Sequence, residues 1–110
     1  MADANVELLQ GTLDLLILKA LALEPMHGWA IAKRIQQMSR DVLTVNQGSL
    51  YPALYRMEER GYIASEPGVS PEGRRITLYK PTAAGRKQLA QRIETWETFA
   101  AAMRSVLRHA

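Results

Sequence analysis

Apolar and polar residues follow a helical period over the first half of the chain. Apolar side chains recur every three or four positions in three segments, which predicts three helices that each bury one face. These segments are residues 13–21, 31–38 and 50–57. The hydroxyl of Thr12 can cap the first helix and Pro25 ends it, so residues 1–10 are expected to be a tail. The apolar stripe of the second helix consists of Ile31, Ile35 and Met38.

The third helical segment contains a proline near its start. With Ser49 as the capping residue, Pro52 falls in the first turn, where its missing N–H group has no partner to lose. If the helix instead starts near Asn46, Pro52 should bend it. Gly61 then ends the helix, because glycine readily adopts the left-handed conformation of a C-terminal cap.

The period changes to two after this helix. In residues 74–80, Ile76 and Leu78 alternate with polar neighbours, and residues 62–66 form a similar short run. Residues 67–73, which lie between the runs, are mostly turn-forming types. We therefore expect a hairpin with a long, loose tip.

The last part of the chain predicts one long helix, capped by Thr82 and ending near Arg108. It contains a heptad seam of apolar residues, which predicts a homodimer, because a monomer would leave this stripe in water. The seam consists of Leu89, Ile93, Trp96, Ala100, Met103 and Leu107. The alternative is that the helix folds back over its own domain, although a length of about 40 Å makes complete coverage difficult.

Composition narrows the classes of protein that fit this pattern. A chain of 110 residues with 47% apolar and 23% charged residues is expected to form one globular domain. Residues 1–81 and 82–110 are then two parts of one structural unit. The apolar run over residues 13–23 is shorter than the ~20 residues of a membrane span, and residues 1–7 contain no basic leader. We therefore expect a cytoplasmic protein that does not bind membranes.

Positive charge is concentrated late in the chain. Residues 1–73 contain six Lys or Arg against nine Asp or Glu, whereas residues 74–110 contain eight against two. This asymmetry suits contact with a polyanion, but a solvated basic face explains it equally well. The order of the elements along the chain has to distinguish between these two interpretations.

Three short helices, a hairpin and a long last helix occur in the order of a winged helix-turn-helix, an α+β and mostly α fold with a C-terminal dimerisation helix. The third helix would enter the major groove of double-stranded DNA, and the hairpin would touch its backbone or minor groove. The candidate DNA-binding residues are Gln47, Gly48, Ser49, Tyr51, Tyr55 and Arg56 on the helix and Arg74 and Arg75 on the hairpin. Half-buried packing explains the two tyrosines equally well, and arginine pairs on strands are often only solvated.

Four stretches in a fixed order carry a more specific signal. They are LLQGTLDLLILKAL at 8–21, PMHGWAIAKRI at 25–35, NQGSLYPALYRMEERGYI at 46–63 and RRITLYKPTAAGRKQL at 74–89. Together they resemble the PadR family of bacterial transcriptional regulators. The resemblance implies a dimeric repressor of the short-tailed kind, with its recognition helix at 48–60 and its wing at 63–80. A two-fold dimer would present its two third helices to successive major grooves of a pseudo-palindromic operator. Trp29 departs from the tyrosine that is frequent in the family, and we expect only altered packing there.

The resemblance also suggests an effector, a small aromatic ligand that releases the regulator from DNA. Some similar short-tailed proteins bind flat aromatic compounds between the two copies, with a tryptophan of the last helix stacking on the ligand. Trp96 occupies the centre of the seam next to Ala100, so it is the candidate ligand-binding residue; a tryptophan that only packs the dimer is an equally good interpretation.

No enzyme, metal or cofactor is expected. The sequence has no cysteine, no nucleophile with a nearby base and no phosphate-cradling glycine loop. We expect His27 to serve as a cap or a packing group at the start of the second helix rather than to bind a metal. The alternative function is a winged-helix module that binds other proteins without specific DNA binding.

Overall fold

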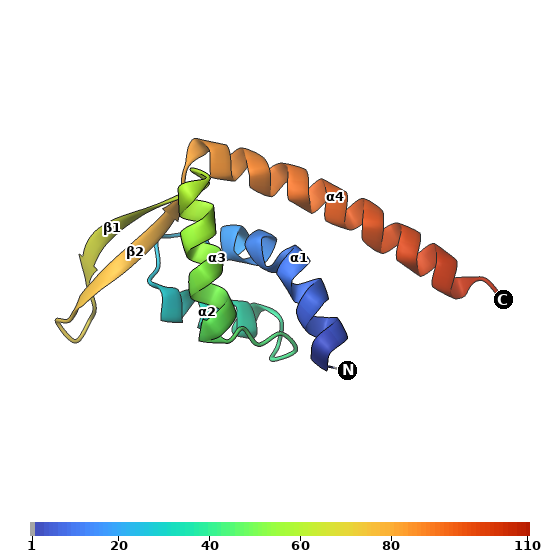
Figure 1. Ribbon diagram of the computed structural model, residues 1–110, viewed down its shortest axis with the longest axis horizontal. Helices are drawn as coiled ribbons and strands as arrows, with labels where there is room; N and C mark the ends of the chain where they lie inside the picture. Colours follow the sequence, from blue (N-terminus) through green and yellow to red (C-terminus); the bar gives the residue numbers. More distant parts are fainter. Residues whose placement is uncertain (1) are drawn as a thin grey trace.

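The computed structural model describes the backbone of residues 2–110 and the side chains from Thr12 onward. Its elements are α1 (Ala2–Leu21), α2 (Gly28–Met38), α3 (Gln47–Glu59), β1 (Ile63–Val69), β2 (Arg75–Pro81) and α4 (Ala83–Arg108). Figure 1 shows the first three helices packed against one another, the hairpin projecting from one side and α4 leaving on the other. No helix of the described part is long and apolar enough to span a membrane.

α1 is longer than the sequence pattern predicts. It begins at Ala2, so the expected tail over residues 1–10 is wrong, and Thr12 lies inside the helix rather than capping it. The only intrinsically poor helix former just before Thr12 is Gly11, and one glycine costs a helix only about 1 kcal/mol relative to alanine. Each further residue adds a hydrogen bond to a helix already nucleated by the apolar turns that follow.

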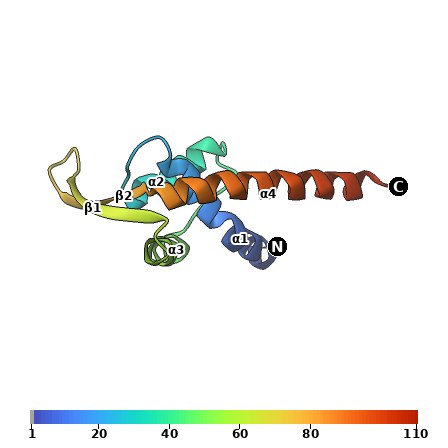
Figure 2. The same ribbon diagram turned by 90° about the horizontal axis from the view of Figure 1, so that it is seen from above.

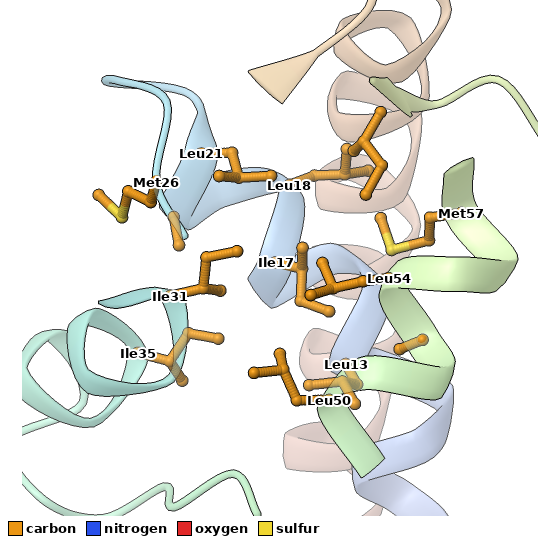
Figure 3. Packing of buried hydrophobic residues seen from close by; sticks show 13 residues of the cluster. Leu13, Ile17, Leu18, Leu21, Met26, Ile31, Ile35, Leu50, Leu54 and Met57 are labelled. Atoms are coloured by element: carbon orange, nitrogen blue, oxygen red, sulfur yellow. The ribbon is translucent and has the colours of Figure 1, made fainter. Parts of the chain in front are cut away.

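The core lies where α1, α2 and α3 meet. Ile17, Ile31 and Leu50, one from each helix, are fully buried, and Figure 3 shows them pointing toward one another. Leu54 and Met57 of α3 complete this contact on the side of α1. The predicted stripe of α2 is right at Ile31 and Ile35 but wrong at Met38, which is 53% exposed because α2 ends there, beyond the packed faces.

α3 begins earlier than predicted. Its capping residue is Asn46, whose side-chain oxygen accepts a hydrogen bond from the Ser49 N–H at 2.9 Å, so the expected cap at Ser49 is wrong. Asparagine is at least as good a cap as serine. Pro52 therefore lies inside the helix and leaves the carbonyl of Gly48 without its helical donor, on a surface where water can replace it.

The hairpin, which we call the wing, is also longer than predicted. β1 and β2 pair antiparallel from Ile63↔Pro81 to Val69↔Arg75, so the loose tip expected over residues 67–73 shrinks to a turn at 70–74. Pro67 is tolerated within β1 because each strand of a two-stranded sheet has a free edge. Gly68 leaves room for the side chain of Leu78 on the neighbouring strand, since a Cβ at Gly68 would lie 2.5 Å from Cδ1 of Leu78.

Two backbone hydrogen bonds tie the wing to the turn before α2. The N–H of Met26 donates to the carbonyl of Tyr79 at 3.1 Å, and the N–H of Tyr79 donates to the carbonyl of Met26 at 2.7 Å. The wing is thereby fixed to the helical core near the middle of β2.

α4 starts in direct contact with the turn that follows α3. The predicted cap is confirmed: the Thr82 hydroxyl accepts from the N–H of Gly85 at 3.0 Å and donates to the carbonyl of Gly61. The Thr82 N–H also donates to the carbonyl of Tyr62 at 3.0 Å. Beyond these turns the helix extends away from the domain and gives the molecule its 58 Å long axis (Figure 2).

Gly85 sets the approach of α4 to this turn, and substitution by alanine should destabilise the fold. A Cβ there would overlap the carbonyl oxygen of Tyr62, which is backbone and cannot swing aside. We expect Gly85→Ala to lower the free energy of unfolding by about 2–3 kcal/mol, as overpacking does in tight sites. Thermal and urea unfolding followed by circular dichroism measures this loss.

The exchange Ala84→Gly at the exposed neighbouring position is the control, and we expect it to cost at most about 1 kcal/mol. A Gly85→Ala protein as stable as the parent would show that α4 is not held by this contact.

Candidate nucleic-acid interface

The N-terminal half of α3 presents an open, uncharged face. Gln47 and Gly48 are exposed and Ser49 is half-buried, while the opposite face of the helix is buried. Tyr55, beyond the middle of the helix, is exposed as well. The first turn carries no acidic residue, and Glu58 and Glu59 lie at the other end. Low side chains and free N–H groups at a helix N-terminus suit the approach of a phosphate.

Tyr51 lies at the border between this face and the core. Its ring packs over Gly28, at the start of α2, where a Cβ would lie 2.6 Å from the hydroxyl oxygen. The side chain nevertheless remains 44% exposed. Packing against α2 and partial exposure are thus both present at Tyr51, whereas Tyr55 is the more open of the two tyrosines.

Arg56 is held by a buried carboxylate. Its Nη2 lies 2.8 Å from Oδ1 of Asp14 on α1, and the side chain of Asp14 is only 8% exposed. The arginine side chain is 42% exposed, so its outer edge still faces solvent. A DNA contact by Arg56 stays a prediction, but this pair gives the residue a structural role that the helical pattern alone did not show.

The wing carries two exposed arginines. Arg74 ends the turn and Arg75 begins β2, and neither side chain forms an ion pair among the described side chains. Lys80 is different, because its Nζ is engaged by Glu66 across the sheet at 3.0 Å. In Figure 1 the tip of the wing and the N-terminal half of α3 both lie below the start of α4.

A polar contact fixes the C-terminal half of α3 to the base of the wing. The hydroxyl of Ser65 on β1 donates to the carboxylate of Glu58 at 2.6 Å. Tyr79 of β2 lies nearby: burial, and then the negative charge of Glu58 and the neighbouring Tyr51, raise the pKa of its hydroxyl. The apolar pattern did not predict this contact between Glu58 and Ser65, because both residues are polar and they lie on different elements, 7 residues apart in the chain.

Of the two roles expected for His27, cap or packing group, the structure shows the cap. It is the N-cap residue, and its Nδ1 accepts a hydrogen bond from the N–H of Ala30 at 3.1 Å.

The seam of α4 divides into two parts. Leu89 packs against the domain's own core and Ile93 is half-buried, so folding back accounts for the first turns of the helix. Trp96 and Met103 are 44% and 43% exposed, and Leu107 is more open still. The exposed apolar face is wider than the predicted seam, because it also includes Phe99 and Val106.

Comparison with known proteins identifies the family of the chain. The family described as transcriptional regulator PadR-like matches residues 17–91, from α1 to the first turns of α4. The chain belongs to the PadR family. It is therefore a member of a family of transcriptional regulators and not of enzymes.

Named relatives and solved structures agree with this assignment. Transcriptional regulator Rv3488 of Mycobacterium tuberculosis is 39% identical over 75 residues, which cover 68% of this chain and 66% of that protein. A transcriptional regulator from Clostridium thermocellum, Cth-833, superposes with a TM-score of 0.82 at 29% identity, covering 90% of this chain and 96% of the other. A PadR family regulator from Eggerthella lenta also reaches 0.82, at 26% identity, with 99% and 93% covered. The predicted winged helix fold with a long last helix is confirmed.

The pair between Arg56 and Asp14 leads to a stability prediction. Removing the arginine leaves a carboxylate buried without its cation, which is costly, and the half-open position of Arg56 moderates the cost. We expect Arg56→Gln to lower the free energy of unfolding by about 1–3 kcal/mol. The double variant Asp14→Asn/Arg56→Gln should lose less than the sum of the two single variants, which urea unfolding measures.

Arg75 is exposed and forms no ion pair with any side chain from Thr12 onward. Its substitution by glutamine is the matched control and should leave stability within about 0.5 kcal/mol of the parent. Additive losses in the double variant would contradict a coupled pair.

Proposed function

We propose that the protein is a homodimeric regulator that represses transcription by binding a pseudo-palindromic operator in the cytoplasm. The observation that carries the proposal is an open N-terminal half of α3 together with two exposed wing arginines that form no ion pair among the described side chains. Both features lie away from the start of α4 (Figure 1). An α-helix fits the major groove, where Gln47 and Ser49 can bond base edges, and arginines on a wing fit the adjacent phosphates. The other candidate, a module that binds proteins only, has no specific observation in its favour.

Binding-site selection from randomised DNA tests this function. We expect a short inverted repeat, with Gln47→Ala changing the recovered bases, because that side chain reaches base edges. Arg74→Ala and Arg75→Ala should instead weaken binding to all sequences alike. Each should also make the negative slope of log K against log salt shallower, by about 0.9 for every phosphate that the protein no longer neutralises.

The control for the removed charge is Lys87→Ala, since Lys87 is exposed at the start of α4, away from the wing tip and the beginning of α3. Recovery of no sequence preference, or binding that does not respond to salt, would contradict a specific regulator.

The homodimer is proposed from the exposed apolar face on the second half of α4. An acidic side chain placed in that face would have to be desolvated on pairing. We therefore expect Met103→Glu to shift the protein from dimer to monomer in sedimentation velocity, while Thr98→Glu on the exposed opposite side of the helix leaves the dimer intact. A Met103→Glu variant that has the same sedimentation coefficient as the parent would contradict this interface.

An aromatic effector is proposed to bind between the two copies at Trp96. The rings of Trp96 and Phe99 lie 5.8 Å apart at 43°, and both are exposed, so they offer a platform on which a flat ring can stack. In a Trp29→Phe variant, Trp96 is the single tryptophan. We expect a planar acridine dye to quench its fluorescence saturably and to raise the melting temperature of the dimer.

The variant Trp96→Leu should lose the dye-induced rise in melting temperature. Unchanged fluorescence and melting temperature in the presence of dye would refute the effector site.

A further inference from the structure

The first two turns of α2 present an exposed aromatic and cationic pair that neither the core nor the proposed contacts of α3 and the wing use. Trp29 is 56% exposed, although it is the largest side chain of the helix. The Nζ of Lys33, one turn later, lies 4.7 Å from the centroid of the indole ring. The buried side of α2 is formed by Gly28, Ile31 and Ile35, so Trp29 and Lys33 face away from the core.

The start of α2 lies between the two elements proposed to bind DNA. Met26 is hydrogen bonded to Tyr79 of the wing through both of its backbone groups. Gly28 is in contact with the ring of Tyr51 on α3. Trp29 therefore follows a segment that touches the wing on one side and α3 on the other, and Figure 1 shows the beginning of α2 on the wing side of α3.

The charge of this surface is positive and unbalanced. α2 contains no acidic residue, and its two basic residues differ in their partners. Arg34 is engaged by Glu24 at 2.9 Å, whereas Lys33 forms no ion pair among the described side chains. The ammonium of Lys33 is thus available to an anion that approaches the indole ring.

A DNA backbone has the chemistry that this pair requires. Its phosphates pair with an ammonium group, and its deoxyribose edges give an indole ring an apolar surface on which to pack. In helix-turn-helix proteins, the helix before the recognition helix crosses the backbone beside the groove. We propose that Trp29 and Lys33 bind the sugar–phosphate backbone that flanks the major groove entered by α3. This inference rests on the proposed function, and it replaces the expectation that Trp29 alters packing only.

The test is the affinity of Trp29→Ala and Lys33→Gln for the selected operator and for random DNA of the same length, measured by fluorescence anisotropy over a range of salt. Because backbone contacts carry no sequence information, we expect each variant to weaken both DNAs alike, by about fivefold. Lys33→Gln should also reduce the salt slope by about 1.8 for a dimer, at 0.9 for each phosphate, and Lys33→Arg should restore it.

Two controls separate this inference from the function on which it rests. Lys87→Gln removes the same charge from the start of α4 and should bind operator as the parent does, and circular dichroism verifies that Trp29→Ala is folded. If the parent and Lys87→Gln bind the operator but Trp29→Ala and Lys33→Gln bind it equally well with the same salt slope, the inference is overturned and the proposed function stands. Failure of the parent itself to prefer any DNA overturns both.

Discussion

The orientation of α3 depends on one apolar contact, the packing of Ile17 on α1 against Ile31 on α2 and Leu50 and Leu54 on α3. All four side chains are fully buried. Burial of a side chain of this kind stabilises a fold by about 1.5–3 kcal/mol, more than any surface ion pair of the molecule can. The contact fixes the buried face of α3 and therefore determines which of its residues are left to face DNA. The ion pair between Asp14 and Arg56 also joins α1 to α3.

The wing and α4 are positioned relative to this core by backbone contacts rather than by side-chain packing alone. Met26 and Tyr79 exchange two hydrogen bonds that hold β2, and Tyr62 accepts the hydrogen bond that fixes the start of α4. Gly85 permits that approach because it has no Cβ. A displacement of α4, for example on binding an effector at Trp96, would therefore reach the end of α3 through Tyr62 and Gly61.

Much of the fold could be predicted from the sequence, because apolar periodicity and caps are local signals. The three helices, the hairpin and the cap at Thr82 were all found in this way. The errors lie where local rules leave more than one outcome open. The segment before Thr12, which was expected to be a tail, continued α1 as a helix, and the turn-forming residues Pro67 and Gly68 were accepted by a strand with a free edge.

The candidate site was less accessible from the sequence for a physical reason. Periodicity identifies the outward face of α3, but it cannot show that Arg56 meets Asp14, which is 42 residues away in the chain. The same limit applies to Trp29, whose exposure depends on how α2 packs on α1 and α3. Asn46 is different, since it directly precedes α3 and is among the strongest capping residues, so the cap could have been found there.

The central claim is that a dimer of this fold places two copies of α3 in successive major grooves of one operator. The most direct test is the affinity for the selected inverted repeat when about five base pairs, half a helical turn, are inserted between its halves. The account predicts that affinity falls to that for random DNA, because a dimer fixed through α4 cannot reach both grooves from one side. Affinity that is unchanged by the insertion would contradict it.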